Sequence, residues 1–415
     1  MFNEHYELSR AVGAGSRDEP LHRLVPYKEA FSPQLVRAIL DHTGISSGTL
    51  LDPFAGAGTS LLVAAERGLG AVGVDLLPFA AFTADALLRA PLADWDLVRR
   101  HARRVQAARP VDVGDFPDFP VRNWAFTPAA LAELTRLHRA IKRLPPGTER
   151  DMVRLALLFI VEHVSQATKD GTSLRRRAHS EGRRGRYQTR RTRNQVLTAF
   201  LDRLSQLEAD AAQHPRPPRE SRAVIGDARC LPAVVGNDAD FDVCIFSPPY
   251  PNRYDYTANY QLELGFGFVA DRSQLKELRR AQLRSHLEAT WPEARTVASH
   301  ALDEFLASLL ASKRVGDQTG RTFRMIAGYF EDMSSVLSGL ATCMRPGAPV
   351  GVVVGTQVFA GQALPTDLLI AEIADSKGFT VKDLWMARRK GVAVQQRARY
   401  SSIPTSRETV ILLEA

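Results

Sequence analysis

The pattern of apolar and polar positions predicts a sheet whose strands alternate with helices. Helical spacing of apolar residues begins at Ser32-Pro33, follows the segment DPFAGAGTS at residues 52–60, and returns at 366–377. The run at 350–355 lacks polar alternation, as expected of a central parallel strand. Strand-like runs lie at residues 49–51, 71–75, 223–227, 241–246, 350–355, 380–385 and 408–413. This alternation predicts a doubly wound α/β sheet.

Two long stretches of helical pattern separate groups of these strands. We therefore expect two helical insertions in one core, the first interrupted at Leu144-Pro145-Pro146-Gly147. The expected division is a first part of the core at 1–85, a helical insertion at 86–220, core at 221–270, a second insertion at 271–325 and the rest of the core sheet at 326–415.

Composition narrows the class of protein. The 415 residues, 45% of them hydrophobic, are enough to form a substantial core. The start MFNEHYELSR has neither a basic segment nor an apolar run, so we expect a cytoplasmic protein without a membrane segment. The cysteines, Cys230, Cys244 and Cys343, lie far apart without Cys-x-x-Cys spacing. The sequence therefore predicts no disulfide, no structural zinc and no metal ligands.

The positive charge is concentrated in the first expected insertion. The net charge is +8, and residues 175–193 alone contain nine arginines against one glutamate. An arginine-only run interleaved with Gly, Ser, Thr and Tyr suits phosphate contact, although a solvated loop is an equally good interpretation of this stretch alone. The candidate nucleic-acid contacts in this run are Arg183, Arg184, Arg186, Arg190, Arg191 and Arg193.

A glycine turn follows the first predicted strand. Gly56-Ala57-Gly58 leads into a helix, and Asp75 ends the next strand 17 residues after Gly58. Such glycines let a ligand approach the backbone, and an acid at this spacing can hold ribose hydroxyls. A nucleoside cofactor is indicated, but Thr59 and its neighbours replace the third glycine usual in dinucleotide sites.

The segment CIFSPPYPNRYDY at residues 244–256 places two prolines directly after a predicted strand. Pro248 and Pro249 fix the backbone and donate no hydrogen bonds, so the loop is stiff and offers carbonyl acceptors. Arg253 and Tyr254 are further candidates for nucleic-acid contact, but an aromatic loop can equally cover a sheet edge.

Together DPFAGAGT, GVDL, IGDA and FSPPY, in this order on successive strand ends, resemble the motifs of S-adenosylmethionine-dependent amino-methyltransferases of DNA. The resemblance implies a Rossmann-like class I methyltransferase fold, S-adenosylmethionine as cofactor, and DNA as partner. It implies catalytic roles for Ser247, Pro248, Pro249 and Tyr250. The implied cofactor-binding residues are Asp52, Phe54, Ala55, Gly56, Gly58, Thr59, Asp75, Asp227 and Ala228, with Tyr27, Phe31 and Pro33 in a segment resembling one that closes over the methionine.

The serine of SPPY resembles enzymes that methylate the exocyclic N4 amino group of cytosine. Ser247 Oγ and the Pro248 carbonyl can accept the two amino protons, while Tyr250 stacks on a base flipped out of the duplex. Two departures are Ala57, where the family usually has serine, and the order of the motifs, which many N4-cytosine enzymes reverse. The absence of a Pro-Cys dipeptide argues against methylation of a ring carbon.

Several alternatives stay open at this point. SPPY does not by itself exclude adenine N6 as the target. An RNA amino-methyltransferase acting on tRNA and a binding subunit without catalysis are rival functions. The recognition sequence, the oligomeric state and a restriction or defence system partner are left open by the sequence.

Overall fold

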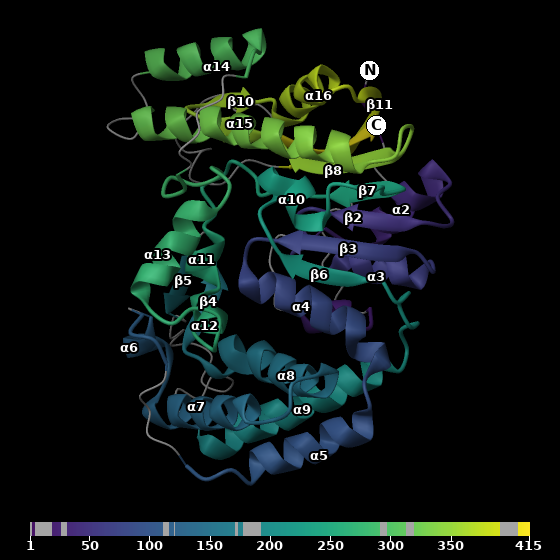
Figure 1. Ribbon diagram of the computed structural model, residues 1–415. Helices are drawn as coiled ribbons and strands as arrows, with labels where there is room; N and C mark the ends of the chain where they lie inside the picture. Colours follow the sequence, from purple (N-terminus) through teal and green to yellow (C-terminus); the bar gives the residue numbers. More distant parts are fainter. Residues whose placement is uncertain are drawn as a thin grey trace.

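The computed structural model describes residues 2–4, 19–25, 31–110, 116–119, 121–170, 173–176, 192–290, 297–312, 319–390 and 406–415. Its centre is an eight-stranded sheet of order β1-β11-β12-β8-β7-β2-β3-β6 (Figure 1). The strands are β1 Phe2–Glu4, β2 Thr49–Asp52, β3 Gly70–Asp75, β6 Arg222–Ile225, β7 Val243–Phe246, β8 Pro349–Gly355, β11 Thr380–Lys390 and β12 Ser406–Glu414.

Strand direction and order confirm the predicted doubly wound fold. Strands β8, β7, β2, β3 and β6 run parallel to their neighbours, and β12 is antiparallel to both β8 and β11. The chain fills the sheet from β2 outward to β6, then returns to β7 on the other side of β2. This reversal makes the β2–β7 boundary the switch point, where such sheets bind ligands at the carboxyl ends of their strands.

Alternate residues of the central strands pack into two different layers. In β7, Val243 and Ile245 belong to a core with helices α2 and α3, whereas Cys244 and Phe246 belong to a core with α15 and α16. All four residues of β7 are buried, which explains the unbroken apolar run in the sequence. The helices of these layers are α2 Pro33–Thr43, α3 Thr59–Glu66, α4 Pro78–Arg89, α10 Leu231–Val235, α14 His300–Ala311, α15 Thr319–Cys343 and α16 Thr366–Ser376.

A separate helical layer lies below the sheet in Figure 1 and is formed mainly by residues between β3 and β6. Its centre is α8, which carries an unbroken buried run from Leu155 to Val161 and contacts α5, α7 and α9. The elements here are η3 Ala90–Leu92, α5 Trp95–Gln106, α6 Arg122–Ala125, α7 Pro128–Lys142, α8 Thr148–Val164, β4 Ala167–Asp170, β5 Ser173–Arg176 and α9 Arg193–Ala211.

Further short elements lead from β7 toward this layer and toward α15. They are α11 Tyr256–Asn259, α12 Gln261–Leu264 and α13 Arg272–Ala281. Two short 3-10 helices lie elsewhere in the chain: η2 His22–Leu24 precedes α2, and η5 Ala228–Cys230 lies between β6 and α10. The buried ammonium of Lys169 in β4 lies 2.5 Å from the Glu263 carboxylate of α12 and 4.2 Å from the centre of the Tyr260 ring. This ion pair ties the insertion to the chain that follows the SPPY loop.

The structure contains three strand features that the sequence analysis did not predict. β4 and β5 form an antiparallel hairpin inside the first insertion, and β9 Gln357–Phe359 pairs with β10 Gln362–Leu364. β1 adds a parallel edge strand beside β11. None of the helices among the described residues combines the length and apolar composition needed to cross a membrane.

Candidate active site

A pocket opens at the carboxyl ends of β2, β3, β6 and β7, beside the switch point of the sheet. It encloses about 800 Å³ of space, part of it continuous with solvent. Its lining residues are Phe31, Pro53, Phe54, Ala55, Gly56, Ala57, Thr59, Asp75, Leu76, Leu77, Asp227, Ala228, Ser247, Pro249, Tyr256, Gln282 and Leu283.

The glycine turn between β2 and α3 forms one wall of this pocket. Gly56 and Gly58 have φ angles of 51° and 81°, a left-handed conformation that side chains other than glycine rarely adopt. A Cβ on Gly58 would also lie 3.0 Å from the backbone Cα of Ala84. The turn therefore requires glycine at Gly58 for both conformation and space.

Asp52 supports the turn from beneath and does not line the pocket. Its side chain is buried and accepts hydrogen bonds from the Phe54 amide, at 2.9 Å, and from the Ser60 hydroxyl. Burial raises the pKa of Asp52 to about 7, although these two hydrogen bonds oppose the shift. The sequence analysis grouped Asp52 with the cofactor ligands, and its contacts indicate a positioning residue.

Asp75 ends β3 and faces the pocket. Its two carboxylate oxygens accept backbone hydrogen bonds from Gly56 and Leu77, each at 2.8 Å. These bonds fix the carboxylate against the glycine turn, and each oxygen keeps a further lone pair for a ligand. Burial raises the pKa of Asp75 to about 6.

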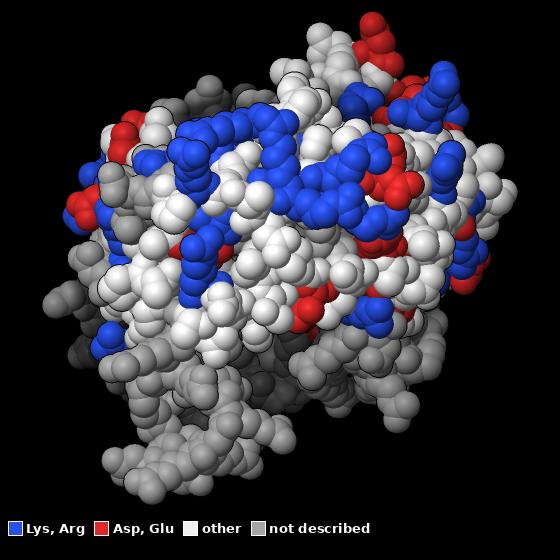
Figure 2. Space-filling view, turned by 90° about the horizontal axis from the view of Figure 1, so that it is seen from below, with Lys and Arg blue, Asp and Glu red and all other residues white. Residues whose placement is uncertain are grey.

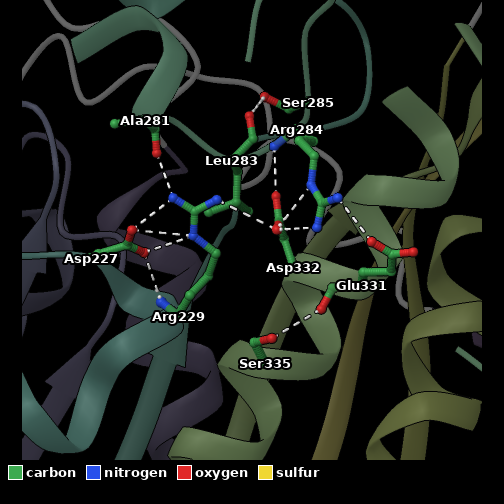
Figure 3. A network of polar contacts seen from close by, with 9 residues as sticks. All are labelled: Asp227, Arg229, Ala281, Leu283, Arg284, Ser285, Glu331, Asp332 and Ser335. Carbon is green, nitrogen blue, oxygen red and sulfur yellow. Dashed lines mark hydrogen bonds and ion pairs between the residues drawn. The ribbon is translucent and has the colours of Figure 1, made fainter. Parts of the chain in front are cut away.

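Asp227, at the end of β6, is held by a neighbour that the sequence analysis did not identify. Arg229 forms a fork on its carboxylate, with Nη2 2.7 Å from Oδ2 and Nε 2.9 Å from Oδ1 (Figure 3). The same guanidinium donates to the Ala281 carbonyl and lies 3.4 Å from Asp332. A bidentate pair of this kind fixes the plane of the Asp227 carboxylate in the pocket wall.

The SPPY loop begins where β7 ends and reaches the same pocket. Ser247 and Pro249 line it, whereas Pro248 is buried behind it. The Tyr250 ring does not line the pocket in this conformation. It lies against the end of β8, where a Cβ built on Gly355 would be only 2.9 Å from Tyr250 Cε2.

Aromatic contact joins the two motif segments. The rings of Phe54 and Phe246 lie 5.7 Å apart, so the glycine turn and the strand before SPPY are packed together. Residues that are 192 positions apart in sequence thus share one site, as the shared sheet edge predicts.

Three pocket residues come from outside the sequence motifs. Tyr256 begins α11, and Gln282 and Leu283 follow α13. The Gln282 Nε2 atom is buried and has no hydrogen-bond partner among the residues that the structure describes. It is therefore a donor at the pocket wall that a ligand can satisfy.

The remaining predicted residues are placed in different surroundings. Pro33 is buried at the first turn of α2, and Tyr254 is 6% exposed with its ring 4.7 Å from that of Tyr256. Arg253, with a φ of 68°, donates a hydrogen bond to Thr322 of α15. Arg193, the first residue of α9, pairs with Glu133 of α7. Tyr27, Arg183, Arg184, Arg186, Arg190 and Arg191 lie outside the described residues.

Comparison with known proteins decides the class of enzyme. No family model matches the sequence. The chain is 26% identical to type II methyltransferase M.BsoBI of Geobacillus stearothermophilus, over 95% of this chain and 86% of that protein. It is 28% identical to type II methyltransferase M.AvaI of Nostoc sp., over 94% and 86%. The chain is a relative of the type II methyltransferases.

Among solved structures, the rRNA methyltransferase aviRa from Streptomyces viridochromogenes covers 94% of this chain and 87% of its own, with 13% identity and a TM-score of 0.31. A score this low supports no conclusion. The type II relationship makes S-adenosylmethionine the methyl donor of this methyltransferase. The pocket fits that donor, because it combines a glycine-lined wall, the Asp75 and Asp227 carboxylates and the unpaired Gln282 amide.

Proposed function

We propose that this methyltransferase modifies DNA at a specific site by transferring a methyl group to the exocyclic N4 amino group of cytosine. The observation that carries the proposal is that Ser247 and Pro249 of the SPPY loop line the same pocket as Asp75 and the glycine turn. Similarity to type II methyltransferases over almost the whole chain supports DNA as the substrate.

The cofactor half of the pocket is assigned by chemistry. Asp75 accepts the ribose hydroxyls, because its oxygens are held in place by the Gly56 and Leu77 amides and retain free lone pairs. Asp227 accepts the adenine amino group, with Arg229 fixing the carboxylate. Phe54, Ala55, Gly56, Thr59, Ala228 and Phe31 form the remaining walls, while Asp52, Gly58 and Pro33 position them.

The reacting half consists of the SPPY loop. When bound, S-adenosylmethionine supplies a methyl group on a positively charged sulfur. Ser247 Oγ and the Pro248 carbonyl accept the amino protons of the target base, which orients the nitrogen lone pair toward that methyl group. The nitrogen–carbon bond would form as the carbon–sulfur bond breaks with its electron pair left on sulfur, and the proton that the nitrogen loses would pass to solvent.

DNA must present its cytosine outside the helix for this chemistry. Flipping a base costs roughly a few kcal/mol, and stacking on Tyr250 offsets about 1 to 3 kcal/mol of it. In this proposal the flipped base stacks on a face of the Tyr250 ring while the Cε2 edge of the ring stays against Gly355. The arginine run of residues 175–193 contacts phosphates, and a restriction or defence system partner is compatible with this role.

A second basic surface supports a polyanionic partner. Figure 2 shows Lys and Arg side chains gathered in a broad band on the face seen from below, where the helical layer lies. Exposed cations on the helices of this layer include Arg100, Arg103 and Arg104 of α5, Lys142 at the end of α7 and Arg143 directly after it. Some of these cations have acidic neighbours, since Arg100 lies 3.9 Å from Asp94.

The test is the identity of the product. DNA treated with the enzyme and isotopically labelled S-adenosylmethionine is digested to nucleosides, which are then separated and identified by mass spectrometry. We expect N4-methylcytosine. A methyl group on adenine N6 would overturn the base assignment. Incorporation of the label into tRNA but not into DNA would overturn the assignment of DNA as the substrate.

A further inference from the structure

Two histidines and two glutamates meet at the end of α3 that lies away from the glycine turn. They come from three separate segments: Glu19 and His22 near η2, Glu66 at the end of α3, and His214 after α9. The ligand atoms of Glu19, His22 and Glu66 all lie within 4.8 Å of one another. The chain that leads from α9 back to β6 brings His214 to the same carboxylate (Figure 1).

His214 has a defined tautomer. Its Nδ1 lies 3.1 Å from the Pro215 carbonyl oxygen, which can only accept, so Nδ1 carries a proton and donates it. In a neutral imidazole the other nitrogen, Nε2, then has an exposed lone pair. This Nε2 faces the Glu66 Oε1 atom at 3.6 Å. Two acceptor atoms in this position need either a proton on Nε2, which makes an ion pair, or a cation bound between them.

His22 repeats this arrangement on the same oxygen. Its Nε2 lies 3.7 Å from Glu66 Oε1, and its side chain is 1% exposed. Neither Nε2 has a hydrogen-bond partner among the described residues. Both distances exceed the 2.7 to 3.2 Å range of ordinary hydrogen bonds. They approach the spacing of about 3.3 to 3.4 Å between ligand atoms that surround a tetrahedral zinc at bond lengths of about 2.0 to 2.1 Å.

Arg37 orients the two carboxylates from their other side. Its Nη2 lies 2.7 Å from Glu19 Oε2 and 2.6 Å from Glu66 Oε2, which leaves Glu66 Oε1 facing the imidazoles. An ionised carboxylate held by an outer hydrogen-bonding partner is typical of a metal ligand.

We propose that Glu19, His22, Glu66 and His214 bind one divalent transition-metal ion as a structural site. Zinc is the expected ion, because two imidazoles and two carboxylates make a set of four nitrogen and oxygen ligands. The ion joins the segment of residues 19–25 to α3 and to the end of α9. It thereby anchors a segment that precedes Phe31 of the pocket lining. The methyl-transfer proposal does not depend on this metal site.

The full chain, stripped with EDTA and dialysed, is titrated with Zn²⁺ in a calorimeter and melted with and without the ion. We expect binding of one equivalent and a Tm that rises by several degrees, since an ion that binds only the folded state stabilises it. His22→Gln and His214→Gln should each lose at least tenfold in zinc affinity. The matched control is His300→Gln, because His300 is exposed and pairs with Glu304 on α14.

Two further measurements separate this site from other sources of the same signals. X-ray absorption at the zinc edge should show nitrogen and oxygen ligands including imidazole; sulfur ligands would assign the ion to cysteine, for which Cys230 is exposed. This measurement uses the unmodified protein, so it stands even where a variant fails to fold. If zinc neither binds at one equivalent nor raises Tm, while both histidine variants lower Tm, the cluster is an ion-pair network and the proposal fails.

Discussion

The Arg229 guanidinium holds the Asp227 carboxylate through two parallel contacts, at 2.7 and 2.9 Å, and is itself only 2% exposed. Asp227 lines the pocket, whereas Arg229 stands behind it. The orientation of the carboxylate that we assign to the adenine amino group is therefore determined by a residue that does not touch the cofactor.

Replacing Arg229 should weaken cofactor binding without removing a cofactor contact. Hydrogen bonds to charged groups contribute roughly 1.5 to 3 kcal/mol, so Arg229→Met should raise the Kd for S-adenosylmethionine about tenfold or more in calorimetry. Arg284→Met is the matched control, because Arg284 shares Asp332 with Arg229 but directs its guanidinium to Asp332 and Glu331 instead of Asp227 (Figure 3). Equal losses in both variants would show general destabilisation instead.

Asp52 should make stability depend on pH in an unusual direction. Burial raises the pKa of Asp52 from 3.8 to about 7. Between about pH 4 and pH 7 the folded protein therefore keeps a proton on Asp52 that the unfolded chain has already released. Unfolding then becomes easier as pH rises through this window. Asn at this position does not titrate and can still bond to Phe54 and Ser60. The Tm of Asp52→Asn relative to the native protein should therefore increase from pH 5 to pH 8.

Thermal melts across this pH range without cofactor check the prediction. The exposed Asp41 provides the control, since Asp41→Asn should shift Tm by a nearly constant amount. A Tm difference for Asp52→Asn that does not change with pH would contradict the assigned titration.

The position of the Tyr250 ring depends on the absence of a side chain at Gly355. A Cβ there would lie 2.9 Å from Tyr250 Cε2, closer than such atoms approach in proteins. Gly355→Val should therefore displace the ring and lower turnover while S-adenosylmethionine affinity stays the same, because neither residue lines the pocket. Tyr250→Phe should retain most activity, and Tyr250→Ala should lose roughly tenfold through lost base stacking. Full activity of both Gly355→Val and Tyr250→Ala would remove Tyr250 from the proposed mechanism.

The sequence predicted the parts of the site that follow directly from strand ends. Asp75 and Ser247 could be placed together because the carboxyl ends of parallel strands meet at one sheet edge, where only β2 separates β3 from β7. Arg229, Gln282 and Leu283 could not be placed in this way. They follow turns and helices whose directions depend on tertiary packing, and no periodicity or motif marks them.

Long-range contacts explain the other omissions. His22, Glu66 and His214 come from distant segments without the short spacing that identifies metal ligands in a sequence, so the cluster that we propose as a metal site has no signal there. The β4–β5 hairpin did have a local signal, Asp170-Gly171, which is typical of tight hairpin turns. The β9–β10 turn consists of Ala360 at a φ of 51° and Gly361 at a φ of 82°; the glycine is a turn signal, whereas alanine in a left-handed conformation is not.

The arginine run should determine the salt dependence of DNA binding. Each phosphate contact contributes a slope of about −0.9 to a plot of log K against log salt concentration, so five contacts account for about −4.5 at most. Replacing Arg183, Arg184, Arg186, Arg190 and Arg191 by Gln should reduce the slope by part of this value and weaken binding to all sequences. Arg193 is kept, because its Nε lies 3.1 Å from the buried Glu133. As a control for the second basic face, Arg103→Gln with Arg104→Gln on α5 removes two exposed cations elsewhere. Fluorescence anisotropy with a duplex at several salt concentrations gives both slopes, and an unchanged slope and affinity in the five-residue variant would exclude the run from the DNA interface.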